Sequence, residues 1–261
     1  LEPNDGCCTA NFHQGWPKFA LSLWLKAEDG IVLSLYAPSI VSYIAPSGEK
    51  VEIAMDTEYP FNDKVQLKFK LNQPAQFKLY FRQLAGASYV LKLNGEEVTT
   101  VLNENGFLSL LRTWRPQDEL VIDWMIKPFL RRWANDSLSV ERGSLVFALP
   151  LSEKWVKVRG VAPSADYELY PQKSWQWGIL EDTDFKVEHQ KLTLQPFNSD
   201  SPPIIVKAGG VKVDNWPEEN LSAGTIPKPQ LTKKEPQELE LIPYGAAKLR
   251  IAQFPIILSE K

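Results

Sequence analysis

Hydrophobic and polar residues alternate with a period of two over most of the chain after Gly30. The segment KVQLKFKL, residues 64–71, places Val, Leu, Phe and Leu on one face and Gln and Lys on the other. AQFKLYFRQL, residues 75–84, repeats this pattern, and the dipeptide Asn94-Gly95 marks a tight hairpin. Such alternation is typical of antiparallel sheets with one buried and one solvent-facing side. The pattern therefore predicts a mainly β protein.

The segment before the first of these strands has a helical period instead. Its apolar positions, at spacings of four, three and four, are Phe12, Trp16, Phe19 and Leu23. This spacing predicts an amphipathic helix over residues 12–26. Because an amphipathic helix must bury its apolar face, we expect it to lie on a sheet or against helices from outside this sequence.

The pattern also predicts how the chain divides into domains. From about residue 155 the strands become shorter and prolines more frequent. The apolar segment 238–261 is too short to fold alone, so it is expected to add strands to an earlier sheet. We predict two antiparallel β-sandwich domains. The first comprises residues 29–154 and the second, with a linker, residues 155–237, and the pattern leaves open which of them the segment 238–261 joins.

Composition and charge exclude several classes of protein. Of the 261 residues, 44% are hydrophobic and 23% charged, which fits a packed core rather than disorder. The formal net charge is -3 and there is no dense run of Lys or Arg, so no nucleic-acid partner is predicted. No apolar run approaches the roughly 20 residues that span a bilayer, so no membrane partner is predicted either. The sequence starts with Leu rather than Met, and the compartment, cytoplasmic or periplasmic and secreted, is left open.

The two cysteines of the chain, Cys7 and Cys8, are adjacent. Neighbouring Cα atoms lie about 3.8 Å apart, whereas a disulfide usually needs roughly 4.4–6.8 Å. The pair therefore reads as two small buried hydrophobic residues, as metal-bound thiolates or as a reactive thiol. His13 is a nearby nitrogen ligand, although a core or hydrogen-bonding role is the simpler interpretation. The sequence does not offer the four ligands of a structural zinc site.

Three further groups of residues are candidate sites. Trp175 and Trp177 are two positions apart and would share one face of a strand, either as core or as a sugar-stacking platform. His189 lies in an alternating segment and reads as an exposed strand residue. The acidic groups that include Asp118 and Glu181 lie at predicted turns, where solvated loop charge explains them.

The segment GCCTANFHQGWPKF, residues 6–19, resembles the end of the catalytic barrel in β-L-arabinofuranosidases of glycoside hydrolase family 127. Those enzymes carry a C-C-x-x-N element, matched here by Cys7, Cys8 and Asn11. Segments such as VLSLYAPSIVSY, GFLSLLRTWRPQDELVIDWMI and LIPYGAAKLRIAQFP resemble, in order, the region C-terminal to the barrel in that family. The resemblance implies an (α/α)6 barrel followed by two β-sandwiches, of which the first, residues 29–154, is completed by residues 238–261. Residues 1–28 would be the C-terminal end of the barrel, truncated here, with the helix as its remnant.

The resemblance also implies a chemistry, namely retaining hydrolysis of arabinose-containing or related glycans by a cysteine nucleophile. Cys7 would be the nucleophile and a Zn2+ ligand, and Cys8 a further Zn2+ ligand. The acid/base Glu and the remaining zinc ligands of the family have no counterpart in this sequence, so the chain is expected to be inactive alone. A homodimer is one expected assembly. The alternative function is a non-catalytic carbohydrate-binding or scaffolding β-module that uses Trp175 and Trp177.

Overall fold

The computed structural model describes residue 7 and residues 11–259, and within them the chain is mainly β. It divides into two compact units, Leu1–Ile126 and Lys127–Lys261, called unit 1 and unit 2 below. The helix α2, Gly15–Leu21, belongs to unit 1. None of the described helices is long and apolar enough to cross a membrane.

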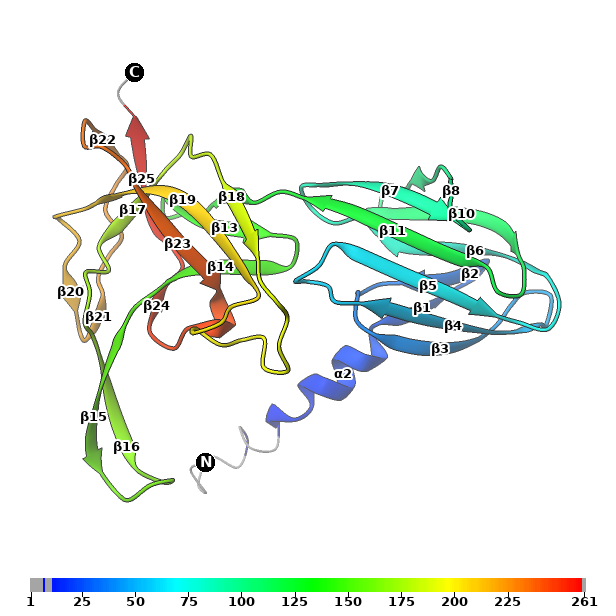
Figure 1. The fold of residues 1–261 in the computed structure, drawn as a ribbon, viewed down its shortest axis with the longest axis horizontal. Helices are drawn as coiled ribbons and strands as arrows, with labels where there is room; N and C mark the ends of the chain where they lie inside the picture. Colours follow the sequence, from blue (N-terminus) through cyan, green and yellow to red (C-terminus); the bar gives the residue numbers. More distant parts are fainter. Residues whose placement is uncertain (1–6, 8–10, 260–261) are drawn as a thin grey trace. The chain divides into compact units, whose positions relative to one another are not determined.

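Unit 1 contains two sheets, which can be followed in Figure 1. The five-stranded sheet has the order β1 (Trp24–Ala27), β2 (Gly30–Leu33), β6 (Ala75–Arg82), β10 (Phe107–Trp114) and β9 (Val101–Leu102). The six-stranded sheet has the order β3 (Ser39–Ile44), β4 (Lys50–Thr57), β5 (Lys64–Lys70), β11 (Glu119–Ile126), β7 (Ala87–Leu93) and β8 (Glu96–Glu97). All pairings in these sheets are antiparallel except that of β2 with β6.

The two sheets of unit 1 share one hydrophobic core, to which apolar residues of both contribute. In β5 and β6 the predicted alternation is confirmed, because the apolar positions are buried and the intervening Lys and Gln residues lie outside the core. The fully buried Trp114 of β10 stacks on Phe69 of the other sheet, with ring centroids 4.0 Å apart. Its indole N–H donates to the carbonyl oxygen of Phe77 at 3.1 Å. Unit 1 is thus the antiparallel β-sandwich that the alternating pattern predicts.

The helix is shorter than the predicted span 12–26, because a strand begins where the second half of the helix was expected. α2 ends at Leu21, and β1 pairs with β2 through a hairpin in which Ala27 faces Gly30. Pairing in this hairpin satisfies the backbone groups that a longer helix would have paired internally. Leu23, assigned to the helical stripe, is buried next to the hairpin, whereas Trp16 on α2 is 77% exposed.

Gly30 at the start of β2 permits the parallel pairing with β6. A Cβ atom at this position would lie 1.8 Å from the carbonyl oxygen of Lys78. No side chain can be accommodated at that distance, so the approach of the two strands depends on glycine.

Unit 2 is built around a ten-stranded sheet. Its main path is β12 (Phe129–Arg132), β13 (Ser137–Arg142), β14 (Leu145–Pro150), β23 (Gln237–Pro243), β19 (Ile204–Lys212), β17 (Trp177–Leu180), β25 (Phe254–Ser259) and β22 (Gln230–Thr232). Off this path, β18 (Lys186–His189) pairs with β19, and β24 (Arg250–Ile251) pairs with β14. Two hairpins, β15 (Glu153–Arg159) with β16 (Asp166–Pro171) and β20 (Glu218–Glu219) with β21 (Ser222–Ala223), and the short 3-10 helix η1 (Tyr244–Ala246) complete the unit.

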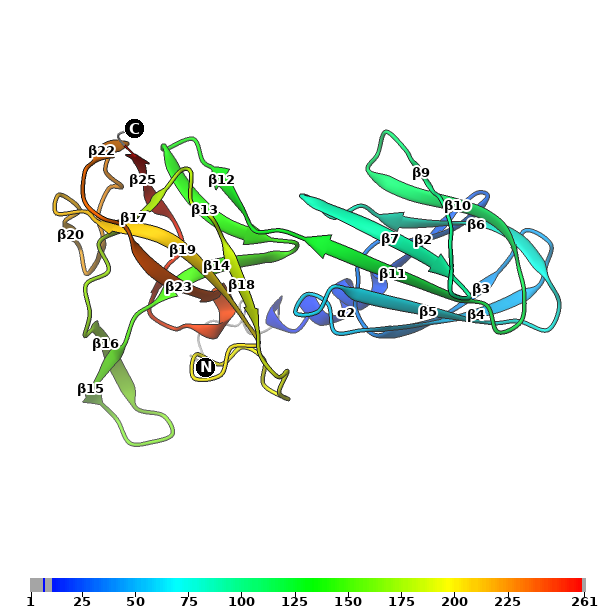
Figure 2. The same ribbon diagram turned by 45° about the horizontal axis from the view of Figure 1, so that its top comes forward.

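The main sheet of unit 2 closes on itself. β25 pairs not only with β17 but also with β13, where Leu138 faces Phe254. The strands β13, β14, β23, β19, β17 and β25 therefore form a closed ring, which can be traced in Figures 1 and 2. Closure leaves none of these six strands as an open edge. The hairpin of β15 and β16 projects from the rest of unit 2 in both views.

The structure divides the chain differently from our prediction. Residues 127–154 and the segment 238–261, both assigned to the first sandwich, lie in unit 2, and so does the whole of 155–237. One core cluster explains this division, because Trp175 and Val211 from 155–237 pack together with Ile257 from the chain's last strand. The predicted linker is partly sheet as well, since β22 pairs with β25. The assignment of residues 1–28 to the end of a helical barrel stays a prediction.

Candidate functional site

The segment that carries the C-C-x-x-N element is held by local hydrogen bonds. The side-chain amide of Asn11 donates to the carbonyl oxygen of Cys7 at 2.7 Å, and Gln14 donates to the side-chain oxygen of Asn11 at 2.8 Å. Cys7 is exposed, and Cys8 lies outside the described residues. Asn11 therefore fixes the backbone of the residue predicted to be the nucleophile, a role that the sequence pattern did not reveal.

The aromatic residues next along the chain are on the surface of unit 1. Phe12 is 88% and Trp16 77% exposed, and Trp16 stacks on Phe19 with ring centroids 5.7 Å apart. His13 is also exposed, which contradicts a place in the core. The predicted amphipathic stripe therefore exists, but within unit 1 its two large rings remain open to solvent.

A zinc site was tested against the described residues. Among residues 7 and 11–259, no group of three or more His, Cys, Asp or Glu side chains is placed to hold a metal ion. The described residues by themselves therefore do not fit Zn2+, which in proteins takes three or four such ligands. The assignment of Cys7 and Cys8 as ligands remains a prediction.

The tryptophan pair near residue 176 is not a stacking platform. Trp175 is 9% exposed and lies edge-on against Trp216, with ring centroids 4.9 Å apart. Trp177 is half-buried, donates its indole N–H to the carbonyl oxygen of Ser174 at 3.2 Å, and has the ammonium of Lys212 5.5 Å from its ring centroid. The core interpretation of Trp175 is confirmed, and a sugar-stacking role shared by both rings is ruled out by that burial.

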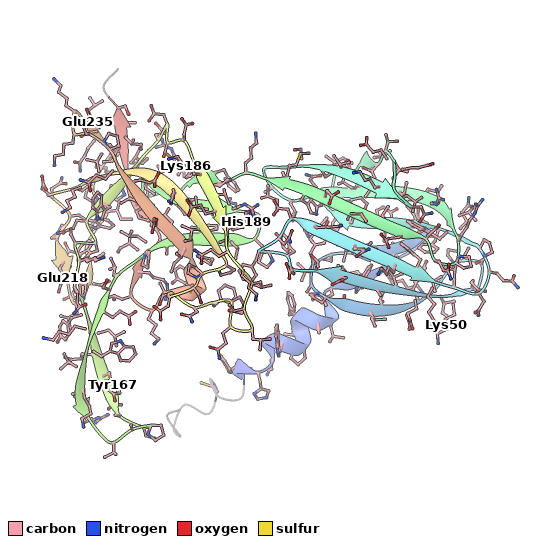
Figure 3. All side chains as sticks on the ribbon, viewed as in Figure 1. Lys50, Tyr167, Lys186, His189, Glu218 and Glu235 are labelled. Carbon is pink, nitrogen blue, oxygen red and sulfur yellow. The ribbon has the colours of Figure 1, made fainter. Side chains whose placement is uncertain are left out.

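His189 and the charged residues around it belong to the outer face of the sheet. His189 is exposed at the end of β18 (Figure 3), as predicted. On the neighbouring strand the ammonium of Lys207 lies 2.8 Å from a carboxylate oxygen of Glu188, and Glu238 and Glu240 lie within 3.5 Å. The hydrogen bond with Glu188, followed by contacts with Glu238, raises the pKa of Lys207 above its ordinary value. This network stabilises the charged form of one lysine and offers no acid or base for catalysis.

Asp118 is a correction to the prediction of solvated turn charges, because it is only 4% exposed. Its carboxylate accepts hydrogen bonds from the side-chain amide of Asn94 at 2.8 Å and from the backbone N–H of Arg115 at 2.9 Å. Arg112 approaches it at 3.6 Å. Asp118 thus joins two turns of unit 1 and has a structural role.

We predict that Asp118→Ala lowers the free energy of unfolding by about 1–3 kcal/mol, because both donors lose a buried acceptor. Chemical denaturation followed by tryptophan fluorescence measures this change. Asp118→Asn, which retains one acceptor oxygen, is expected to lose less. Equal stability of Asp118→Ala and the parent would contradict the role assigned to the carboxylate.

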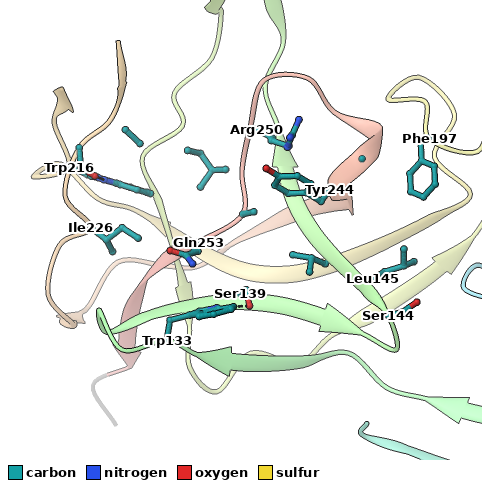
Figure 4. Close-up of a pocket in the computed structure, with 16 residues that line it drawn as sticks. Trp133, Ser139, Ser144, Leu145, Phe197, Trp216, Ile226, Tyr244, Arg250 and Gln253 are labelled. Atoms are coloured by element: carbon teal, nitrogen blue, oxygen red, sulfur yellow. Dashed lines mark hydrogen bonds between the residues drawn. The ribbon is translucent and has the colours of Figure 1, made fainter. Parts of the chain in front are cut away.

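A concave site within the described part of unit 2 was not predicted from the sequence. It is a cavity of about 870 Å³, shown in Figure 4. Its half-exposed aromatic residues are Trp133, Phe197 and Tyr244. Polar groups in the lining include Ser144, Arg250 and Gln253.

Trp133 in this cavity is held by a buried polar chain. Its indole N–H donates to the hydroxyl of Ser139 at 2.9 Å, and that hydroxyl donates to a carboxylate oxygen of Glu141 at 3.1 Å. Arg131 donates to the same oxygen at 2.6 Å. Ser139 and Glu141 are both less than one-tenth exposed, although they are polar and alternate with apolar residues in β13. The sequence carries no burial signal for this polar row, because the side chains that contact it, Trp133 and Arg131, come from the neighbouring segment rather than from β13.

The described chain is β-rich and consists of two units, and unit 1 includes the segment that carries Cys7. Residues 30–125 match the family described as beta-L-arabinofuranosidase, GH127 middle domain. A search of curated proteins found no match. The match covers the sandwich of unit 1, and the resemblance to GH127 β-L-arabinofuranosidases inferred from the sequence is confirmed.

Solved structures share the fold over nearly the whole chain. A GH127 β-L-arabinofuranosidase from Geobacillus stearothermophilus T6 superposes with a TM-score of 0.67 at 19% identity, covering 97% of this chain and 38% of that one. A structure described as a glycoside hydrolase gives 0.67 at 17% identity, with 97% and 40% covered. A GH127 β-arabinofuranosidase gives 0.66 at 17% identity, with 98% and 40% covered. The chain therefore spans about two fifths of the length of these structures, and at such identities the likeness shows the fold.

Proposed function

We propose that this chain is the C-terminal portion of a glycoside hydrolase that acts on arabinose-containing or related glycans. The observation that carries the proposal is the match of residues 30–125 to the GH127 middle domain. The common fold over 97% of the chain supports it further, because units 1 and 2 both have counterparts in glycosidase structures. The acid/base residue of the reaction is proposed to come from residues outside these 261.

The proposed reaction is retaining hydrolysis in two steps. The thiolate of Cys7 attacks the anomeric carbon, and the bond from that carbon to the leaving-group oxygen breaks while a glutamic acid protonates the oxygen. Water then attacks the anomeric carbon of the glycosyl-cysteine, loses a proton to the same glutamate, and returns the thiolate. Two features of the described residues support this role, namely the exposure of Cys7 and the hydrogen bond from Asn11 to its carbonyl oxygen.

For zinc, we propose only which residues of this chain would be its ligands. Cys7 and Cys8 would supply two thiolates, and the other ligands would come from outside this chain, because the described residues alone do not fit the metal. No step of the reaction is assigned to the metal.

The test of the proposed function is hydrolysis of an aryl β-L-arabinofuranoside by the longest polypeptide that the reading frame around this sequence encodes. Release of the aryl alcohol with retained configuration at the anomeric carbon is expected, since two successive displacements restore the original configuration. Absence of hydrolysis of this and related aryl glycosides, by a folded and metal-loaded protein, would refute the proposed function.

We predict that Cys8→Ser lowers the zinc content of that polypeptide from about one ion per chain to well below one, because a neutral hydroxyl is a far weaker ligand than a thiolate. Metal analysis by mass spectrometry after gel filtration measures it. Lys18→Ala, a change in an exposed residue of α2, should leave the zinc content at the parent value. Full zinc occupancy in Cys8→Ser would show that this cysteine is not a ligand.

A further inference from the structure

The cavity of unit 2 is lined by residues to which the proposed hydrolysis assigns no role. Every residue of its lining lies within Lys127–Lys261, whereas Cys7 and Asn11 belong to unit 1. Its volume of about 870 Å³ falls within the range of ligand-binding sites, roughly 300–1,000 Å³. We propose that this cavity binds an oligosaccharide, with Trp133 and Tyr244 as stacking surfaces for sugar rings.

The first stacking surface is fixed in advance. Trp133 is 44% exposed, yet its N–H group is occupied by Ser139, which is in turn held by Glu141. A ring anchored at its edge in this way keeps its faces for a ligand and loses little conformational entropy on binding. A tryptophan that served only as core would be expected to bury its ring instead.

The second stacking surface is Tyr244, which is 46% exposed. The guanidinium carbon of Arg250 lies 3.7 Å from the centroid of its ring, and Arg250 also donates to the carbonyl oxygen of Lys248 at 2.9 Å. The guanidinium is thus committed to the protein and holds the tyrosine ring in place. In Figure 4, Gln253 lies between Trp133 and Tyr244, and Phe197 lies beyond Tyr244.

A third aromatic ring, that of Phe197, lies close to the backbone of Gly245. Next to Tyr244 in η1, a Cβ atom at Gly245 would lie 3.0 Å from the ring of Phe197. The absence of a side chain at Gly245 therefore lets the half-exposed ring of Phe197 join the lining of the cavity. The three half-exposed aromatic rings give the cavity room for more than one sugar.

The chemistry of the lining selects the class of ligand. Among the described residues that line the cavity, the one charged side chain is Arg250, whose guanidinium lies over the ring of Tyr244 and donates to the carbonyl oxygen of Lys248, so most of the lining is uncharged. Exposed aromatic faces pack against the C–H faces of sugar rings, and the hydroxyl of Ser144 and the amide of Gln253 can exchange hydrogen bonds with sugar hydroxyls. A saccharide matches this lining, because it has both apolar faces and many hydroxyl groups. The choice of arabinose as its sugar rests on the proposed function.

The test is titration of the chain of 261 residues with L-arabinofuranose oligosaccharides, measured by isothermal calorimetry. Saturable binding is expected, and Trp133→Ala and Tyr244→Ala are each expected to weaken it at least about tenfold through loss of a stacking surface. The matched control is Trp155→Ala, because Trp155 is a 46% exposed tryptophan on the hairpin outside the cavity. It should bind as the parent does.

Two additional measurements keep the result decisive. Trp133→Phe retains a stacking ring but not the hydrogen bond to Ser139, and should bind more tightly than Trp133→Ala. Circular dichroism establishes that each variant is folded.

The proposal is overturned if the parent binds no saccharide up to roughly 10 mM, if it binds a proline-rich peptide in place of saccharides, or if folded Trp133→Ala and Tyr244→Ala bind saccharides as tightly as the parent does. None of these outcomes affects the hydrolysis test, so failure of the cavity and failure of the proposed function are distinguishable.

Discussion

Replacement of Cys7 by serine is expected to lower kcat/KM for an aryl β-L-arabinofuranoside by at least about 10³-fold, and to remove turnover in practice. The reason is chemical, because a serine hydroxyl at neutral pH is protonated and is a much weaker nucleophile than a thiolate. The hydrogen bond from Asn11 to the Cys7 carbonyl oxygen involves only the backbone of residue 7. It should therefore survive in Cys7→Ser, so a loss of activity would report on the sulfur rather than on local folding.

The measurement is steady-state hydrolysis by the longest encoded polypeptide, with circular dichroism to establish that the variant is folded. Trapping with a slow substrate and mass spectrometry of the peptide that carries Cys7 should reveal a glycosyl adduct in the parent and none in the variant. Lys18→Ala is the control and should retain parent activity. A Cys7→Ser enzyme that hydrolyses at the parent rate would eliminate cysteine catalysis.

Replacement of Gly30 by alanine is expected to be the most damaging small change in unit 1. The added Cβ atom would meet the Lys78 carbonyl oxygen at 1.8 Å, and that oxygen belongs to backbone rather than to a flexible side chain. Either β2 separates from β6, or the whole sheet shifts. We expect the free energy of unfolding to fall by at least about 3 kcal/mol.

Hydrogen exchange detects this change within unit 1, because backbone amides of β2 and β6 should exchange much faster in Gly30→Ala than in the parent. Gly15→Ala is the matched control, since nothing lies within 4 Å of a Cβ atom at Gly15 in α2. Alanine favours a helix over glycine, so this variant should be at least as stable as the parent. Unchanged protection in Gly30→Ala would mean that the two strands do not approach as described.

The local pattern was sufficient to predict which face of the central strands of unit 1 is buried, but not the bounds of the unit. In β5 and β6 the apolar residues point into a core between two sheets, so burial follows the period of two directly. The same rule failed in β13, where Ser139 and Glu141 alternate with apolar residues but are buried, because Trp133 and Arg131 contact them. Closure of the ring in unit 2 is a second feature that the local pattern does not predict. Closure depends on a pairing between residues distant in sequence, Leu138 with Phe254, which no local pattern contains.

The candidate site shows the same division between local and distant information. The C-C-x-x-N element was recognised from Cys7, Cys8 and Asn11, whereas the hydrogen bond from Asn11 to the Cys7 carbonyl oxygen came only from the structure. The cavity of unit 2 was not visible, because Trp133 and Tyr244 are far apart in sequence and are brought together by the sheet. Trp175 was visible but ambiguous, and only its contact with Trp216 assigned it to the core.

The position of β25 in the ring has a consequence for biosynthesis. In unit 1 the last strand to leave the ribosome, β11, completes the sandwich, so this half can fold while the rest is still being translated. In unit 2, β13 and β17 both pair with β25. They therefore lack this neighbour in the nascent chain until residues 254–259 have been synthesised. A premature stop codon shortly before residue 254 would therefore release a folded first half joined to a sheet in which β13 and β17 have open edges, a product prone to aggregate.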